Sequence, residues 1–351
     1  MLSNTDIAEL LAQQAERETG ILSRAYRRAA RNAFLWPEEI SHLVAQNRPL
    51  TELRGIGPFI EKQIRNWFDE ALRRAKSVPA LRQDFISMAE ARRLLATRPS
   101  WPGKLHGDLQ MHSHWSDGSA TIAEMADAAK ERSYEYIAIT DHSKGLKIAG
   151  GIDERALKRQ GTEIGKVNAA LSKSGSQLTV LRSIEMNLNP RGEGDMSPDS
   201  LLGLDLVLGS FHSALRTTED QTERYLAALR NPYVHILGHP RGRIYNFRIG
   251  LKADWPRVFA EAARLHKALE IDCYPDRQDL NVALLKIARE HGTRISLGTD
   301  AHHGWQLEFI DLGLAAALRA KISTDRIVNF MSLLELKTWA QALRHGNASK
   351  K

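Results

Sequence analysis

The chain has 351 residues, 42% of them hydrophobic and 26% charged, which is ordinary for a soluble globular protein with room for one large and one small domain. Cys273 is the only cysteine, which excludes a disulfide framework and a thiolate metal site. No apolar run reaches about 18 residues and no secretion signal opens the chain, so we expect a cytoplasmic protein with no membrane partner.

The formal net charge of +7 is unevenly distributed along the chain. Residues 1–104 contain 17 Lys and Arg against 12 Asp and Glu, whereas the remaining residues contain 32 against 30. The basic excess therefore belongs mostly to the N-terminal segment. It indicates a polyanionic partner there, or a basic surface that serves solubility alone.

The first segment, residues 4–32, has the apolar spacing of helices. Asn4 or Thr5 can cap its start, and Gly20 can separate two helices. We expect a third helix over Glu38–Ala45, with Pro37 in its first turn.

A glycine-containing turn, Leu53 to Gly57, precedes a helical pattern that puts Ile60, Ile64 and Trp67 on one face. It resembles a helix-hairpin-helix element that binds nucleic acid. Gly55 and Gly57 allow a tight turn that exposes backbone N–H groups at a helix N-terminus, where phosphate binds, and Lys62 follows in the helix. The alternative is a plain corner between two helices.

With its preceding helices, residues 4–70 are similar to the small N-terminal DNA-binding domain of family X DNA polymerases. In that family a lysine in the helix after the hairpin performs lyase chemistry, but its position falls on Gln63, so we do not expect lyase activity. Residues 71–104 leave no room for a polymerase palm, and polymerase activity is excluded. The predicted domains are a helical DNA-binding domain at 1–75, a helical, proline-containing linker at 76–104 and an α/β domain at 105–345.

From Leu105 onward, strand-like apolar runs alternate with helical patterns over residues 121–132, 153–172, 220–230, 254–267 and 279–291. Seven such repeats predict a seven-stranded closed parallel barrel of the TIM-like class. Functional residues of such barrels lie at the carboxyl ends of the strands.

Metal-binding side chains recur at these strand ends: His112, Asp141-His142, Glu185, His212, His239, and Asp300 with His302. Five of the 13 histidines are in this position, which a set of unrelated core histidines would not explain. Imidazole and carboxylate ligands without thiolate suit zinc, manganese or iron. A set larger than one ion needs predicts a multinuclear site of two to three divalent ions.

The ordered motifs HSHWSDG, ITDHS, SIEMN, GSFHS, GHPRGR and GTDAHH resemble the PHP (polymerase and histidinol phosphatase) domain over roughly residues 105–345. The resemblance implies metal-dependent phosphoester hydrolysis. It also implies three ligand groups: His112, Glu185 and Asp300; Glu185, His212 and His239; and Asp117, His142 and His302.

One position departs from the family pattern, which has His-x-His followed five residues later by the acid. Counting back from Asp117, the first histidine position is occupied by Gln110, whose carbonyl oxygen can still serve as a ligand. His114 is an additional histidine that can compensate or can point to substrate or solvent.

Further candidates follow from the charge of a phosphate substrate. Arg243 is predicted to contact the phosphate and, with Glu185 and Asp117, to be catalytic, and Arg241 and Lys144 are either further phosphate contacts or solvated loop charges. Asp141 can orient His142 or cap the next turn.

We therefore predict a phosphoesterase that acts on DNA, as a 3′-end phosphatase or exonuclease related to repair, by in-line attack of metal-activated water on phosphorus. No protein partner is predicted. One alternative is a small-molecule phosphomonoesterase of histidinol-phosphatase type. Another is a non-catalytic DNA-binding protein.

Overall fold

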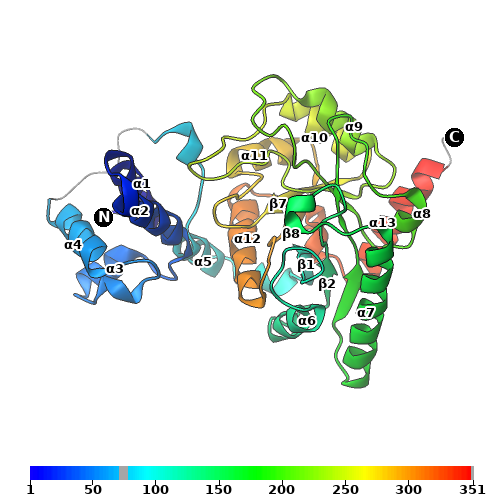
Figure 1. Ribbon diagram of the computed structural model, residues 1–351, viewed down its shortest axis with the longest axis horizontal. Helices are drawn as coiled ribbons and strands as arrows, with labels where there is room; N and C mark the ends of the chain where they lie inside the picture. The colour runs from blue at the N-terminus through cyan, green and yellow to red at the C-terminus, as the bar shows by residue number, and fades with distance from the viewer. Residues whose placement is uncertain (71–77, 349–351) are drawn as a thin grey trace.

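The computed structural model describes residues 1–70 and 78–348, with a helical N-terminal part beside an α/β part (Figure 1). The predicted boundary between residues 75 and 76 lies outside the described residues. The helical part contains α1 (Asn4–Arg17), α2 (Gly20–Asn32), η1 (Ala33–Leu35), α3 (Ile40–Ala45), η2 (Leu50–Glu52) and α4 (Pro58–Asp69).

Two helix starts differ from the prediction. Ser3, rather than Asn4 or Thr5, caps α1, because its hydroxyl accepts the backbone N–H of Asp6 while the Asp6 carboxylate accepts the N–H of Ser3. Helix α3 begins at Ile40, so Pro37 precedes the helix instead of lying in its first turn.

The turn before α4 has the predicted form. Gly55 has φ of +84°, and a Cβ atom there would overlap the side-chain amide of Asn32, so the turn requires glycine. Ile60, Ile64 and Trp67 are buried on one face of α4, as their spacing predicts.

The connector to the α/β part contains η3 (Ala80–Arg82), α5 (Met88–Ala96) and η4 (Pro102–Lys104). Helix α5 packs against α12 (Ile310–Arg319), where Arg92 pairs with Asp311 at 3.4 Å and Arg319 with Glu90 at 2.8 Å. Met88 and Leu95 of α5 share one buried apolar cluster with residues of the barrel. The connector is therefore part of the packed α/β unit.

The α/β part contains parallel strands that alternate with helices. The strands are β1 (Gly107–Met111), β2 (Tyr136–Ile139), β3 (Thr179–Arg182), β4 (Glu185–Asn187), β5 (Leu208–Ser210), β6 (Ile236–Leu237), β7 (Ala268–Asp272) and β8 (Arg294–Gly298). The helices are α6 (Ile122–Glu131), α7 (Glu154–Lys173), α8 (Pro198–Leu202), α9 (Thr222–Arg230), α10 (Trp255–Arg264), α11 (Val282–Glu290), α12 and α13 (Leu333–Ala348), with η5 (Lys147–Ala149), η6 (Gly304–Phe309), η7 (Thr324–Arg326) and η8 (Val328–Phe330).

The strands form two sheets, ordered β1-β2-β3 and β4-β5-β6-β7-β8. The run predicted as one strand at 180–185 is divided, because β3 pairs with β2 while β4 pairs with β5. Parallel bridges join the sheets at both seams, between His142 and Glu185 and between Met111 and Ala301. The two sheets therefore surround a common interior as a distorted barrel, but they hold eight strands among the described residues rather than the predicted seven.

The helical part rests on the loop that follows β6. Tyr245 of this loop packs edge-on against Phe34 and Phe85, with ring centroids 4.8 Å and 5.2 Å away. Beside it, the buried guanidinium of Arg82 pairs with Glu9 at 2.8 Å and donates to the side chain of Asn246 at 2.9 Å. Among the described helices, none combines the length and apolar character needed to cross a membrane.

Candidate metal centre

The site is assembled at the carboxyl ends of the barrel strands, where parallel strands bring their final residues together. His112 follows β1, and its N–H donates to the carbonyl of Ala301 after β8 at 2.7 Å. Asp300 has φ of +52°, and its N–H donates to the carbonyl of Gln110 at 3.0 Å. A non-glycine residue in this conformation is strained, and it is held here by hydrogen bonds across the seam.

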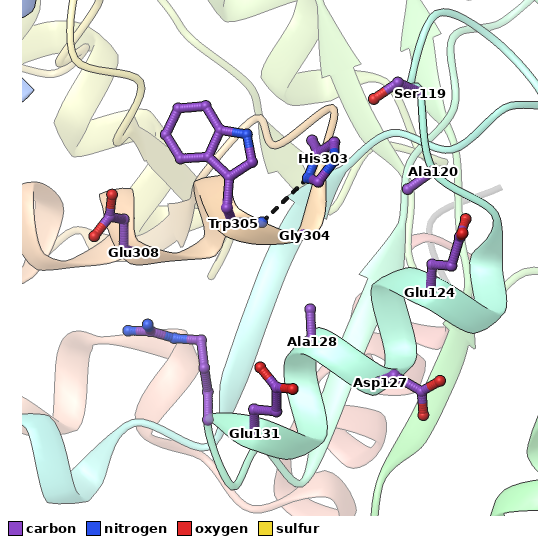
Figure 2. Close-up of a pocket in the computed structure, with 11 residues that line it drawn as sticks. Ser119, Ala120, Glu124, Asp127, Ala128, Glu131, His303, Gly304, Trp305 and Glu308 are labelled. Carbon is purple, nitrogen blue, oxygen red and sulfur yellow. Dashed lines mark hydrogen bonds between the residues drawn. The ribbon is translucent and has the colours of Figure 1, made fainter. Parts of the chain in front are cut away.

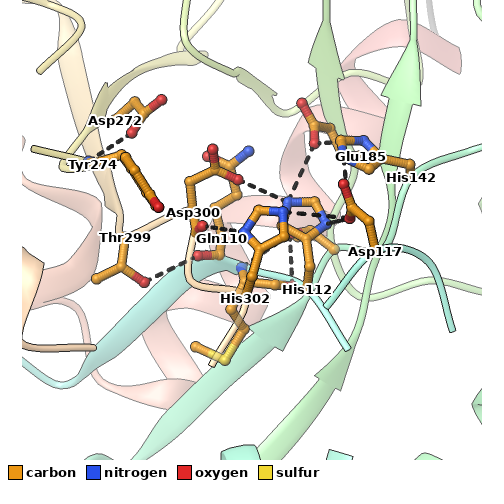
Figure 3. A network of polar contacts seen from close by, with 12 residues as sticks. Gln110, His112, Asp117, His142, Glu185, Asp272, Tyr274, Thr299, Asp300 and His302 are labelled. Atoms are coloured by element: carbon orange, nitrogen blue, oxygen red, sulfur yellow. Dashed lines mark hydrogen bonds and ion pairs between the residues drawn. The ribbon is translucent and has the colours of Figure 1, made fainter. Parts of the chain in front are cut away.

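Glu185 is completely buried, and Figure 3 shows it beside His142. Its Oε1 is 2.6 Å from Nε2 of His239 and 3.1 Å from Nε2 of His212. Its Oε2 is 3.0 Å from Nδ1 of His142 and 3.5 Å from Nε2 of His112. One carboxylate therefore contacts four imidazoles from four different strand ends, which suits the predicted bridging ligand.

Asp117 organises a second group on the more exposed side of the cluster. Its Oδ1 lies 3.3 Å from Nε2 of His302, 3.6 Å from Nε2 of His142 and 3.9 Å from Nδ1 of His112. The ring of His112 stacks between those of His142 and His302, at centroid distances of 4.4 Å and 4.5 Å. Asp117 is 35% exposed, so this group faces the opening of the site.

Two sets of ligand atoms are close enough to hold a metal ion, each with its atoms within 4.8 Å of one another. One set is His112, Asp117, His142 and His302, and the other is His142, Glu185 and His212. Nδ1 of His142, Oε2 of Glu185 and Nε2 of His212 are buried and form ion-pair contacts, but none of the three makes a hydrogen bond of good geometry. Buried imidazole nitrogens and carboxylate oxygens that converge on one point are suitable ligand atoms for a divalent cation. These residues therefore fit the metal that the sequence predicts.

The electrostatics of the site keep its carboxylates ionised. Burial by itself would raise the pKa of Glu185, but His142, His212 and His239 outweigh it and hold that pKa well below its ordinary value. Burial would lower the pKa of His142, but Glu185 and Asp117 raise it to about 10. Anionic oxygens beside imidazoles are the charge pattern of a cation site without thiolates.

The first predicted ligand group, that of Gln110, His112, Glu185 and Asp300, has a different environment. Oδ1 of Asp300 lies 2.9 Å from Nε2 of His112, whereas its Oδ2 lies 3.0 Å from Nη1 of Arg277. The amide of Gln110, oriented so that its contacts are satisfied, donates from its nitrogen to both Glu270 oxygens, at 2.5 Å and 2.8 Å. Two members of this group therefore have other partners: Asp300 pairs with Arg277, and Gln110 pairs with Glu270.

The weaker sequence candidates lie around the cluster. The side chain of His114 is exposed and packs toward Trp115, with ring centroids 5.9 Å apart, so it does not join the ligand atoms. Asp141 accepts from the N–H and hydroxyl of Ser113 and from Ser116, which fixes the loop that leads to Asp117. Lys144 pairs with Glu154 at 2.7 Å, outside the cluster.

The phosphate contact predicted for Arg243 is wrong. Its guanidinium is buried, stacks 3.8 Å from the ring centroid of Phe85, and donates to the carbonyls of Gln83, Asp84 and Arg277. Arg241 donates to the carbonyl of Ile249 within the same loop. Arg243 contacts residues 83–85 of the connector instead of the metal-ligand cluster, and the sequence of its own loop does not predict this contact.

A separate hollow of about 600 Å³ lies between α6 and η6 (Figure 2). Its walls carry one cationic side chain, Arg132, against four carboxylates, with His303 at one end; the carboxylates are those of Glu124, Asp127, Glu131 and Glu308. Four carboxylates repel an anionic ester, so the cluster around Glu185 is the candidate for phosphate chemistry.

Three polar residues near the cluster were not assigned a role by the sequence: Glu270, Asp272 and Arg277. Glu270 and Asp272 alternate at the end of β7 and are completely buried. Burial, and then Asp272, raise the pKa of Glu270 well above its ordinary value. Two acids spaced two residues apart at the end of a strand lie on the same face of the sheet, and this spacing could have identified Glu270 and Asp272 from the sequence. The position of Arg277, in the loop after them, had no such signal.

The residues predicted to contact DNA lie on the surface of the helical part. Gly55, Gly57 and Lys62 are exposed. Arg54 of the same turn stacks over the ring of Trp305, 5.1 Å from its centroid, and Trp305 is the second residue of η6, three residues after His302. The hairpin turn therefore contacts the segment that follows one of the ligands.

The chain matches the PHP domain model over residues 108–274. It is 36% identical over 238 residues to the DNA polymerase/3'-5' exonuclease PolX of Bacillus subtilis, a match that covers 68% of this chain but 41% of the polymerase. It is 31% identical to a probable phosphatase of Photobacterium profundum, over 55% of this chain and 78% of that relative.

A crystal structure of histidinol phosphate phosphatase from Lactococcus lactis, complexed with zinc, L-histidinol and phosphate, aligns with a TM-score of 0.43 and 18% identity over 61% of this chain and 93% of that one. The domain match and the phosphatase relative agree with the ordered strand-end motifs. The chain belongs to the PHP domain family, and it is a phosphoester hydrolase.

Proposed function

We propose that the protein is a metal-dependent phosphoesterase that hydrolyses phosphate esters at DNA ends, as a 3′-phosphatase or 3′-exonuclease in repair. Two to three ions of zinc, manganese or iron would be held by the strand-end ligands. The observation that carries the proposal is the convergence of four imidazoles on the buried carboxylate of Glu185.

The roles of the residues follow from their positions. Glu185 would bridge ions held with His212 and His239 on one side and with His142 on the other. Asp117 would complete the group that faces the opening. When bound, divalent ions supply Lewis acidity toward the ester and activate water as the nucleophile. The protein holds the ligands rigidly and excludes bulk water from the buried side.

DNA is the favoured substrate because of the helical part. Its hairpin glycines and Lys62 are exposed, and Arg54 links the hairpin to the segment after His302 through Trp305. DNA bound by its backbone at the hairpin would lie beside the rim of the site, and the basic excess of residues 1–104 favours such sequence-independent contact.

The test compares turnover of a 3′-phosphorylated oligonucleotide with that of small phosphomonoesters, before and after chelation of the metal. We expect kcat/KM for the oligonucleotide to exceed that for the small ester by about tenfold or more, because the DNA backbone makes additional phosphate contacts outside the site. A Lys62→Glu variant should reduce oligonucleotide turnover and leave the small ester unaffected. Equal efficiency on both substrates, insensitive to Lys62→Glu, would favour the small-molecule phosphatase instead.

The match to the phosphatase relative supports that second candidate, because it covers 78% of a protein described as a phosphatase. A non-catalytic DNA-binding protein is disfavoured by the intact cluster. Metal analysis of the purified protein, with Glu185→Ala and His212→Ala, tests both enzyme proposals together. Purified protein with no bound or activating metal would contradict them.

A further inference from the structure

The ligand cluster is rich in negative charge, which a phosphate ester must approach. Asp117, Glu185 and Asp300 are its carboxylates, and Asp272 lies behind Asp300. Divalent ions would offset part of this charge. A phosphoryl group carries charge on several oxygens, so a fixed cation at the rim would help to bind it.

Arg277 is the arginine that reaches this cluster. Among the ion pairs of the described residues, it is the one arginine or lysine side chain that contacts a member of the predicted ligand set. Its Nη1 lies 3.0 Å from Oδ2 of Asp300 and 3.6 Å from Oδ2 of Asp272. Asp300 in turn contacts His112, so the guanidinium is one carboxylate away from the core of the cluster.

The side chain of Arg277, taken as a whole, is partly exposed. One third of it is exposed, similar to the 35% of Asp117 and the 27% of His302 on the open side of the cluster. Both ion pairs of the head group involve Nη1. A guanidinium has five N–H donors in a planar fork, so it can contact Asp300 and still offer donors to an oxyanion.

The backbone around Arg277 is held from behind. Its carbonyl accepts Nε–H of Arg243 at 2.8 Å, and its N–H donates to the carbonyl of Tyr274 at 2.9 Å. Because these contacts use the backbone, they remain when the Arg277 side chain is replaced. A substitution there therefore changes the charge at the rim with little change in the loop.

We propose that Arg277 is a substrate-contacting residue of this site, whose guanidinium binds non-bridging oxygens of the phosphate ester. The inference rests on the proposed phosphoesterase function and names the side chain that recognises the substrate anion. It assigns to Arg277 the role that the loop sequence suggested for Arg243.

The experiment measures binding of inorganic phosphate by calorimetry to the full-length, metal-containing protein. The variants are Arg277→Gln, Arg277→Lys and a matched surface control, Arg257→Gln, whose guanidinium pairs with Glu223 on the outside of the barrel. Metal content and melting temperature are measured for each protein, together with KM and kcat for a small phosphomonoester.

We expect the phosphate Kd and the KM of Arg277→Gln to rise about tenfold or more, since a charge-assisted hydrogen bond is lost. Arg277→Lys should recover part of the affinity, and Arg257→Gln should behave as wild type. Metal content should stay at the wild-type value in all of them.

Two results would overturn the proposal. One is unchanged phosphate affinity in Arg277→Gln. The other is loss of metal in parallel with affinity, which would mean that Arg277 acts by positioning Asp300. Because phosphate binding needs no turnover, wild-type protein that binds phosphate through Arg277 but hydrolyses no ester would refute the proposed function and leave this assignment in place.

Discussion

Arg243 donates from Nε to the backbone carbonyl of Arg277 over 2.8 Å, so one arginine supports the loop that presents the other. The first is buried against the connector and the second reaches Asp300. A structural arginine and a site arginine are therefore adjacent in space although their loops follow different strands. This relationship makes the two substitutions distinguishable by experiment.

Replacing Arg243 by Gln should destabilise the fold more than it changes substrate contact. The change removes hydrogen bonds to three carbonyls and the stacking on Phe85, which we expect to lower the free energy of unfolding by about 2–4 kcal/mol. Urea denaturation measures it. Arg241→Gln, within the same loop, should cost less than about 1 kcal/mol; equal losses for both would contradict the structural role.

His142 is the imidazole shared by both candidate ligand sets, so its loss should affect the whole centre. We expect His142→Ala to lose most of the bound metal and to lower kcat/KM by about 100-fold or more. Elemental analysis and steady-state kinetics provide the measurement. His106→Ala is the control, because His106 pairs with Glu135 at 2.9 Å and lies outside the cluster. Retention of full metal content by His142→Ala would refute the assignment.

Gln110→His should increase metal binding at the group that includes Asp300. An imidazole at 110 could donate one N–H to Glu270, as the amide does, and present its other nitrogen as a ligand. We expect the content to rise by about one ion per chain, whereas Gln110→Leu should not raise it. Equal metal content in the three proteins would mean that residue 110 does not control occupancy there.

Gly55→Ala should weaken DNA binding through the hairpin. Alanine disfavours φ of +84°, and its Cβ would overlap the amide of Asn32, a combined cost of about 2–3 kcal/mol to the turn. Gly165, in α7 of the α/β part, has open space around it and no positive φ, so Gly165→Ala is the matched control. Affinity for an oligonucleotide at fixed salt is the readout, and small-ester hydrolysis should be unchanged. Deleting the helical part is a poorer test, since it would expose Tyr245.

Lys267 should make stability depend on alkaline pH. Burial lowers the pKa of its ammonium group to about 7, whereas the unfolded chain keeps the ordinary value. Between these values the unfolded state binds more protons, so stability rises as the pH increases from 7 toward 10. We expect a rise on the order of 2 kcal/mol that is absent in Lys267→Met. Urea midpoints at pH 7 and 10 measure it, and identical slopes in both proteins would contradict the prediction.

The alternation of parallel strands with helices, and the gathering of histidines and acids at the strand ends, were readable from the sequence. Parallel strands buried on both faces leave continuous apolar runs, and the carboxyl ends of those runs meet at one edge. His112, His142, His212 and His239 could therefore be grouped from their positions alone. The hairpin was readable for a similar reason, because only glycine suits the backbone conformation at Gly55.

The tertiary structure decided which side chains in the loops face the site. The sequence by itself determined that metal-binding types of side chain gather at the strand ends, because that follows from local strand periodicity and parallel topology. It did not determine that Arg243 turns toward Gln83, Asp84 and Phe85, or that Gln110 meets Glu270. Those contacts join segments about 160 residues apart in the chain, and a loop side chain takes its direction from such partners rather than from its neighbours in sequence.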